Sequence, residues 1–259
     1  MSADVVFDGL ADDFERDIYN SSKGYIRLKV LWHDLSEGLP RIHDGNWRIL
    51  DAGGGMGQVA GKLATLGHRI VLCDPSTEML AKAERALRAQ GLQDRVQLVE
   101  STLQQLPERV SGKYEVILCH AVLEWLESPH DALFNLRHFL LPEGYLSLMY
   151  YNQNAALMTA LLAGEFSVAW TYLTGGKVLS GYKKQSAPLD PQTVAQWLDE
   201  AGFDILCKSG IRIFHDHMPD ECKKGSELEK LLEVEKRLRM TEPFASLGQH
   251  IHLICQLRN

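Results

Sequence analysis

The sequence predicts an α/β protein whose mostly parallel β-sheet is covered by helices on both faces. Two observations carry this prediction: apolar runs alternate with amphipathic segments from Trp47 onward, and a glycine-rich turn follows the first run. Of the 259 residues, 45% are apolar and 24% are charged, so the chain can bury a core of its own. We therefore expect a single domain that spans residues 1–259.

Seven apolar runs have the length and composition of buried strands. In chain order they are Arg48–Ala52, Ile70–Asp74, Val96–Glu100, Tyr114–His120, Tyr145–Tyr150, Phe203–Ser209 and His250–Gln256. The helices predicted between them are Gln58–Leu66, Thr77–Gln90, Asp131–Leu140 and Pro191–Ala201. Asp190 is the expected N-cap of the last helix, because an aspartate before Pro191 can accept a backbone N–H of the first turn.

The alternation divides the chain into three parts. Residues 1–44 precede the first strand, and helical periodicity within Asp4–Leu39 predicts an N-terminal helical cap over the ligand. Residues 45–150 are the expected cofactor-binding half, and residues 151–259 are the expected substrate-side half. Long insertions after late strands commonly form lids or substrate surfaces. The second half has two of them, 152–189 and 215–247, and the latter contains a charged helix near Ser226–Met240.

Composition argues against several classes of protein. Met1–Asp13 lacks the basic and apolar regions of a secretory signal, and the apolar stretch Ala155–Ala163 is too short to span a bilayer. The five cysteines are widely spaced, which is typical of buried reduced thiols. We expect a cytoplasmic protein without a membrane span. The net charge of −7 disfavours broad nucleic-acid binding but leaves room for a local basic patch.

A glycine-rich turn, Asp51-Ala52-Gly53-Gly54-Gly55-Met56-Gly57, lies between the first predicted strand and the next helix. Glycines let the backbone turn sharply and approach a ligand, and the helix N-terminus supplies free N–H groups. Asp74 ends the second predicted strand, where a carboxylate can accept hydrogen bonds from ribose hydroxyls. Together the turn and Asp74 predict a nucleoside-binding site.

Two other interpretations of this turn remain open. Its glycines could serve packing alone, and Gly55–Ala60 formally fits the G-x-G-x-x-A pattern of nicotinamide-dependent oxidoreductases. That match begins later than the end of the strand requires, and it does not explain Asp51. A carboxylate at Asp51 attracts an ammonium group and repels a pyrophosphate, which favours a ligand with an amino-acid moiety.

Leu50–Gly57 resembles the first motif of class I S-adenosylmethionine-dependent methyltransferases, and Asp74 resembles their ribose-binding acid. Thr102–Pro107 takes the place of the adenine-edge loop, with Thr102 where an acid is usual. The resemblance covers about residues 45–150 and includes Cys119–Trp125 and Leu141–Leu146. It implies a Rossmann-like class I methyltransferase fold, with a seven-stranded, mostly parallel sheet whose last strand is antiparallel. It also implies S-adenosyl-L-methionine as the cofactor.

Further segments resemble one subfamily, the bacterial tRNA 5-carboxymethoxyuridine methyltransferases, which form a methyl ester at the wobble uridine. They are Ile18–Arg27, His120–Trp125, Leu148–Asn152 and Gly210–Asp216. In that subfamily the arginine at the position of Arg27 helps to hold the cofactor, and a guanidinium group fits the methionine carboxylate. A surface ion pair is the alternative role of Arg27. The cofactor contacts predicted in this way are Arg27, Asp51, Gly53, Gly54, Gly55, Asp74, Thr102, Leu103 and His120.

The subfamily resemblance implies that the anticodon loop of tRNA is the partner. A carboxylate substrate is ionised near neutral pH and can attack the sulfonium methyl group directly, so no catalytic base is predicted. The candidates for positioning the substrate are Tyr151, Lys183, Lys184 and Arg212. An RNA surface could be built from Lys177, Tyr182, Lys183, Lys184, Arg212 and His215.

Other functions stay open beside this one. They are methylation of a small molecule such as a quinone precursor, nicotinamide-dependent oxidation, and cofactor binding without catalysis. A metal site is not predicted, because no Cys-x-x-Cys pair or full ligand set accompanies the spaced histidines and cysteine. These residues are His215, His217, Cys222, His250 and His252.

Overall fold

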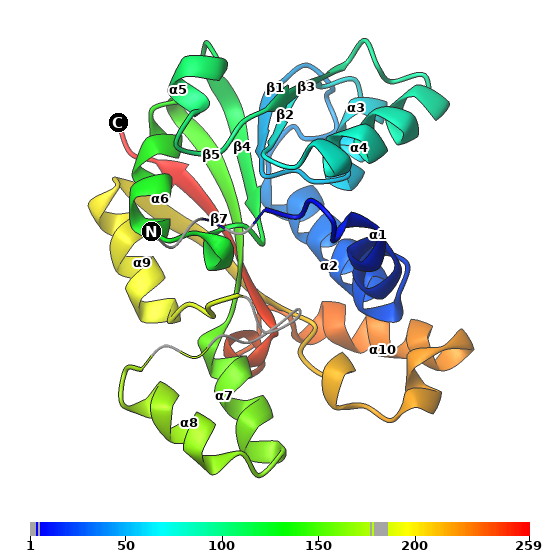
Figure 1. Ribbon diagram of the computed structural model, residues 1–259, viewed down its shortest axis with the longest axis vertical. Helices are drawn as coiled ribbons and strands as arrows, with labels where there is room; N and C mark the ends of the chain where they lie inside the picture. Colours follow the sequence, from blue (N-terminus) through cyan, green and yellow to red (C-terminus); the bar gives the residue numbers. More distant parts are fainter. Residues whose placement is uncertain (1–3, 5, 177, 179–185) are drawn as a thin grey trace.

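Seven strands form one sheet in the computed structural model of the protein, which describes residues 4, 6–176, 178 and 186–259. The strand order is β3-β2-β1-β4-β5-β7-β6 (Figure 1). Strands β1 to β5 pair with one another in parallel, whereas β7 is antiparallel to both β5 and β6. The predicted sheet is confirmed. Its strands are β1 (Arg48–Ala52), β2 (Arg69–Asp74), β3 (Val96–Glu100), β4 (Tyr114–His120), β5 (Leu140–Tyr151), β6 (Phe203–Ile211) and β7 (His250–Leu257).

The predicted helices between the strands are present, with small shifts at their ends. Strand β5 begins at Leu140, because Leu140 already pairs with Tyr114 of β4, and α6 therefore ends at Arg137. Asp190 caps α9 as predicted, since its carboxylate accepts the N–H of Thr193 at 3.0 Å. The α-helices are α1 (Ala11–Phe14), α2 (Ser22–Gly38), α3 (Gln58–Thr65), α4 (Thr77–Ala89), α5 (Leu106–Arg109), α6 (Pro129–Arg137), α7 (Gln153–Leu162), α8 (Phe166–Leu173), α9 (Pro191–Glu200) and α10 (Gly225–Leu238).

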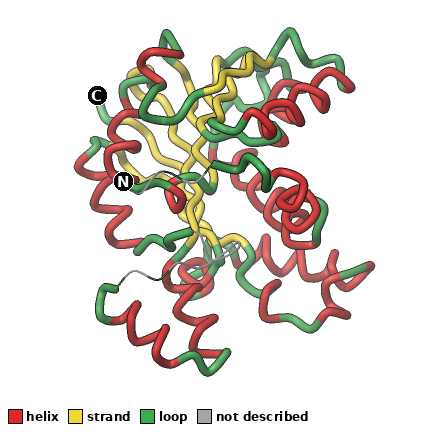
Figure 2. Tube along the Cα trace, in the orientation of Figure 1, coloured by secondary structure: helices red, strands yellow, loops and turns green. Residues whose placement is uncertain are grey.

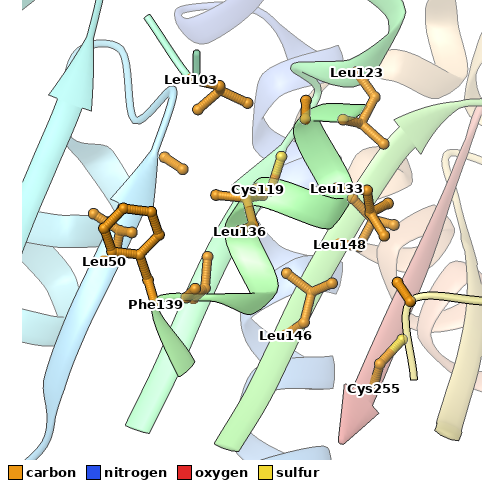
Figure 3. Packing of buried hydrophobic residues seen from close by; sticks show 14 of the residues in the cluster. Leu50, Leu103, Cys119, Leu123, Leu133, Leu136, Phe139, Leu146, Leu148 and Cys255 are labelled. Atoms are coloured by element: carbon orange, nitrogen blue, oxygen red, sulfur yellow. The ribbon is translucent and has the colours of Figure 1, made fainter. Parts of the chain in front are cut away.

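Alternate residues of the strands face two hydrophobic clusters, one on each side of the sheet. Figure 2 shows the strands of the sheet with helices on either side. On β1, Leu50 belongs to the cluster that contains α6 and α9 residues, and Ile49 to the cluster that contains α2, α3 and α4 residues. Figure 3 shows part of the first cluster, in which Leu136 of α6 and Leu146 of β5 take part. Burial on both faces explains why these strands are almost continuously apolar in sequence.

The strand order brings distant chain segments together at one edge of the sheet. The connections reverse direction between β1 and β4, and sheets of this kind bind ligands outside the carboxyl ends of their strands at such a point. The pairing of β5 with β7 and of β7 with β6 continues this edge into the antiparallel strands. Tyr151 at the end of β5 pairs with His250 at the start of β7, and His250 pairs with Ile211 at the end of β6.

The segments outside the sheet lie around this edge. Helix α1, the π-helical turn Glu15–Tyr19 and α2 precede β1, and α2 packs beside α10 of the second insertion (Figure 1). Helices α7 and α8 form the first insertion and continue from the carboxyl end of β5. In the part of the chain that is described, we find no helix with the length and apolar character needed to cross a membrane.

Candidate functional site

A cavity of about 560 Å³ opens at this edge of the sheet. Small-molecule sites usually measure roughly 300–1,000 Å³. The walls come from the turn after β1, from the ends of β2, β4, β5 and β6, and from the N-terminal segment. The structure brings most of the predicted site residues into these walls: Arg27, Asp51, Gly53, Gly54, Gly55, Asp74, His120, Tyr151 and Arg212.

The glycine turn after β1 leaves no room for side chains at Gly53 and Gly54. Gly53 has a φ of +77°, and a Cβ there would lie 2.4 Å from Cγ2 of Val122. A Cβ at Gly54 would lie 2.7 Å from the carboxylate of Asp51. Gly55 has a φ of +54°, and its N–H donates to Oδ2 of Asp74 at 2.9 Å. Glycine is therefore required at this turn, and its backbone forms part of the cavity wall.

Two buried carboxylates flank the turn. Asp74 accepts the N–H groups of Gly55 and Ser76, each at 2.9 Å, and keeps further lone pairs for hydroxyl donors. Burial raises the pKa of Asp74 to about 6 against the effect of these hydrogen bonds. Burial and the charge of Asp74 raise the pKa of Asp51 to about 7. A ligand that brings hydroxyl groups to Asp74 and a cation to Asp51 would favour the ionised form of both.

Arg27 is a buried cation that faces the cavity from α2. It is 7% exposed, and its guanidinium carbon lies 5.3 Å from the ring centre of Tyr19. Among the described residues we find no ion pair between Arg27 and an aspartate or glutamate, and burial lowers its pKa. Its partners in the described residues are the Tyr19 hydroxyl, through a hydrogen bond, and the nearby Glu124, and a buried charge without a close ion pair is costly. This position therefore favours an anionic ligand group such as a carboxylate.

Arg212 lines the cavity from the insertion side, near enough to Arg27 for the two charges to interact. It follows β6 in the left-handed conformation, with a φ of +59°. Its guanidinium group donates to both carboxylate oxygens of Asp216 at 2.7–2.9 Å. Glu235 of α10 holds the turn that carries Asp216 by accepting backbone N–H groups from Ile213, Phe214 and His215. The second insertion thus fixes the orientation of Arg212.

Two buried atoms of the cavity wall, Oε2 of Glu124 and Nδ1 of His250, have no hydrogen-bond partner among the described residues. Burial raises the pKa of Glu124 to about 7 and lowers that of His250 well below its usual value. The ring centres of His250 and Tyr151 lie 5.9 Å apart. Unpartnered buried polar groups are rare in folded proteins, so these atoms are candidate contacts for a polar ligand.

Some predicted residues lie elsewhere. Thr102 and Leu103 do not line the cavity: Leu103 is buried in the core, and the hydroxyl of Thr102 accepts the N–H of Gln105. Their side chains complete the core and a turn, so a contact with the cofactor would have to use their backbone, and it stays a prediction. Lys183 and Lys184 lie outside the described residues, as do Lys177 and Tyr182.

Two of the spaced histidines, His215 and His252, have other partners. His215 Nε2 lies 2.9 Å from the Ser22 hydroxyl, and His252 Nδ1 lies 2.9 Å from a carboxylate oxygen of Asp34. Over the described ranges, no group of three His, Cys, Asp or Glu side chains is placed to hold a metal ion. The cysteines are free, and the buried ones are Cys73, Cys119 and Cys255.

The N-terminal segment contributes an aromatic row to the cavity wall. Phe7 packs edge-on against Trp125 at 4.9 Å and against Phe14 at 4.8 Å, and Phe14 packs against Tyr19 at 5.4 Å. Asp8 ties this segment to α4 by accepting the hydroxyl of Ser76 at 2.6 Å. The helical periodicity of the sequence predicted a helical cap here, but it did not predict which residues the cap contacts.

Among the cavity residues that were not predicted from the sequence are the polar residues Tyr19, Glu124 and His250. The sequence signal for these residues was their position beside a predicted helix or strand. Tyr19 precedes the helix of Arg27, Glu124 follows the fourth strand, and His250 begins the last strand. Polar residues at the ends of strands in this fold are candidates for ligand contacts.

Comparisons with known proteins agree with this geometry. The family described as Methyltransferase domain matches residues 50–148. The chain is 39% identical over 249 residues to the tRNA 5-carboxymethoxyuridine methyltransferase of Escherichia coli (strain K12), covering 95% of this chain and 94% of that protein. It is 24% identical over 182 residues to a ubiquinone biosynthesis O-methyltransferase of Rickettsia canadensis, covering 70% of this chain and 72% of that protein.

A solved structure shares the fold. It is magnesium protoporphyrin IX methyltransferase from Synechocystis PCC 6803 with bound SAH, at a TM-score of 0.63 and 17% identity over 97% of this chain and 96% of that chain.

The cavity fits S-adenosyl-L-methionine, the cofactor of this family. Arg27 would pair with its carboxylate, Asp51 would accept from its ammonium group, and Asp74 would accept from its ribose hydroxyls. The chain belongs to the class I S-adenosyl-L-methionine-dependent methyltransferases, in the family that includes the Escherichia coli tRNA 5-carboxymethoxyuridine methyltransferase.

Proposed function

We propose that this enzyme methylates the carboxylate of 5-carboxymethoxyuridine at the wobble position of tRNA, in the cytoplasm, and so forms the methyl ester. The observation that carries the proposal is 39% identity across 95% of the chain to the E. coli enzyme of that name. A match of this extent includes the insertions beside the cavity as well as the cofactor-binding half. Substrate choice depends on such site-specific segments more than on the shared fold.

The reaction requires the protein to align the reacting atoms, and it does not require acid–base catalysis. When bound, S-adenosyl-L-methionine supplies a methyl group on a sulfonium centre. An oxygen of the substrate carboxylate forms the new C–O bond while the C–S bond breaks, and the electron pair of that bond stays on sulfur. The products are the ester and S-adenosylhomocysteine, and no proton moves. Because the carboxylate is already ionised near neutral pH, the protein has to orient it and exclude water.

Arg212 and Tyr151 are the proposed positioning residues for the acceptor. The charge of Arg212 is shared with Asp216, so Arg212 can orient an incoming carboxylate without binding it as tightly as an unpaired cation would. Tight ground-state binding would reduce the nucleophilicity of the carboxylate. Glu124 and His250 offer polar atoms to the edge of a uracil ring that has left the base stack. Lys183 and Lys184 remain proposed contacts for the RNA.

Methylation of a small-molecule hydroxyl is the competing function, because the chain is also similar to a ubiquinone biosynthesis O-methyltransferase. A phenol has a pKa of about 10 and is protonated near neutral pH. That reaction would therefore need a general base. The neutral imidazole of His250 is the candidate in the cavity wall.

The test uses labelled S-adenosyl-L-methionine with two tRNA preparations. One comes from a strain that lacks this enzyme, and the other also lacks the carboxymethoxy group. We expect label only in the first preparation. Equal label in both tRNAs, or label in neither while a quinone precursor is methylated, would contradict the proposed function.

A further inference from the structure

Helices α7 and α8 carry a group of large apolar side chains that face solvent. Leu162 at the end of α7 is 69% exposed, and on α8 Phe166 is 69%, Trp170 67% and Leu173 62% exposed. Leu161 beside them is 45% exposed. In the rest of the described chain, the exposed fraction of a large apolar side chain reaches at most 52%. We call these five residues the α8 face.

The exposed side chains of α8 lie along one side of the helix. Phe166, Trp170 and Leu173 follow the i, i+4, i+7 spacing of a helical stripe. Tyr172 is 5% exposed and packs in a small cluster with Tyr151 of the cavity wall. Helix α8 therefore packs on the rest of the enzyme with a different side, and its apolar stripe faces outward at one end of the molecule (Figure 1).

The charge around the α8 face favours a protein as its partner. Glu165 is the only charged residue between Gln153 and Gly176, although 24% of the whole chain is charged. A helix that binds a lipid surface carries Lys and Arg on its polar side, and a surface that binds RNA needs cations for the phosphates. Neither α7 nor α8 contains a Lys or Arg. The cores of homodimer interfaces, in contrast, are apolar, poor in charge and rich in aromatic residues.

The area of the α8 face suits a contact between two copies of the chain. At about 200 Å² per large side chain, the exposed parts of the five residues amount to roughly 600 Å² in one copy. That is the upper end of the largest apolar patch on a typical monomer. Two such faces together would bury about 1,200 Å², which is the lower limit for a specific, stable interface. A two-fold axis pairs a face with itself, so a second copy supplies the complementary surface.

We propose that the α8 face joins two copies of the enzyme in a symmetric dimer. Trp170 lies between Phe166 and Leu173 on the stripe, so it packs near the centre of the contact. Aromatic side chains at the centre of an interface commonly carry most of the binding free energy. Tyr172 stays on the inner side of α8 with Tyr151. The dimer would thus hold α8 from outside and support the Tyr151 wall of each cavity.

Trp170→Glu tests the proposal, and Val234→Glu is the matched control. Val234 is another exposed apolar residue of a helix, but it belongs to α10 and lies outside the α8 face. Analytical ultracentrifugation from about 1 to 100 µM covers the weak end of the affinities that interfaces show. We expect the unaltered enzyme and Val234→Glu to approach twice the monomer mass of 29.1 kDa. Trp170→Glu should raise the dimer dissociation constant at least about thirtyfold.

Two further measurements accompany the mass. Neither substituted residue lines the cavity, so all three proteins should bind S-adenosylhomocysteine alike, which shows that the variants fold. Hydrogen exchange locates the contact: amides of residues 161–173 should exchange more slowly at the higher concentration in the unaltered enzyme, and they should not in Trp170→Glu.

Several results would overturn the dimer. They are an unaltered enzyme that stays monomeric up to about 100 µM, a dimer that Trp170→Glu leaves intact, equal dissociation of the two variants, and protection from exchange that lies outside α7 and α8. A monomeric enzyme that loses binding to tRNA or to anionic lipid vesicles in Trp170→Glu would also contradict the proposal, and it would assign the α8 face to that partner.

Discussion

Replacing Arg27 with methionine separates cofactor binding from folding stability. The arginine is 7% exposed, and in the described residues it has a hydrogen bond with Tyr19 and an attraction to Glu124 but no close ion pair. Methionine keeps most of the aliphatic length and removes the charge. Because an uncompensated buried charge costs free energy, we expect the free variant to be at least as stable as the unaltered protein.

The same change should weaken cofactor binding. Hydrogen bonds to charged groups contribute about 1.5–3 kcal/mol, which corresponds to a roughly ten- to hundredfold change in affinity. Calorimetry with S-adenosylhomocysteine measures the loss, and thermal unfolding without ligand measures the stability of the variant.

Arg239→Met is the matched control for stability. Arg239 is also 7% exposed, but it pairs with Asp34 and Glu37. Breaking a buried pair costs about 3–5 kcal/mol, so this variant should unfold at a clearly lower temperature. The role of Arg27 is refuted if Arg27→Met binds S-adenosylhomocysteine with unchanged affinity, or if it loses as much stability as Arg239→Met.

Further predictions concern the glycine turn and Asp74. Asp74→Ala should weaken S-adenosylhomocysteine binding by about 1.5–3 kcal/mol through loss of the ribose acceptor, and an unchanged Kd in a folded variant would exclude that role. Gly55→Val should abolish cofactor binding, because Gly55 has a φ of +54° and its Cβ would lie 3.3 Å from the Tyr19 hydroxyl. Full activity of this variant would show that the turn does not approach the ligand. Affinity should fall as pH drops below about 6, because ribose hydroxyls bind the ionised Asp74 and its pKa in the free protein is about 6. Asp51, with a pKa of about 7, adds an acid limb of its own, because it accepts from the ammonium group in its ionised form. Binding titrations of Asp74→Asn should therefore keep the Asp51 limb and lose the Asp74 limb, and a variant with an unchanged acid limb would contradict this.

The strands and the cofactor side of the cavity were predictable because their determinants are local. Buried parallel strands are continuous apolar runs, and the turn after β1 needs glycines that the sequence displays. Arg27 and Asp74 were predicted because the motifs around them resemble those of a known family. The structure places both in the cavity wall.

How the residues on the antiparallel side of the cavity come together depends on strand register, which the sequence does not reveal. Tyr151, His250 and Ile211 meet because three strands from distant parts of the chain pair at their ends. Ser147 and His252 interrupt apolar runs, and nothing local indicates that they bond to each other. The apolar side chain of Leu103 completes the core, and its contact with the adenine stays a prediction.

The most direct test of the proposed reaction is nucleoside mass spectrometry of the product tRNA before and after mild alkali. The substrate is tRNA that carries 5-carboxymethoxyuridine, incubated with the enzyme and S-adenosyl-L-methionine. We expect one added methyl group on that nucleoside, and we expect mild alkali to restore the free acid, because an ester hydrolyses under these conditions. A methyl group that survives alkali, or one found on a different nucleoside, would contradict methylation of the carboxylate.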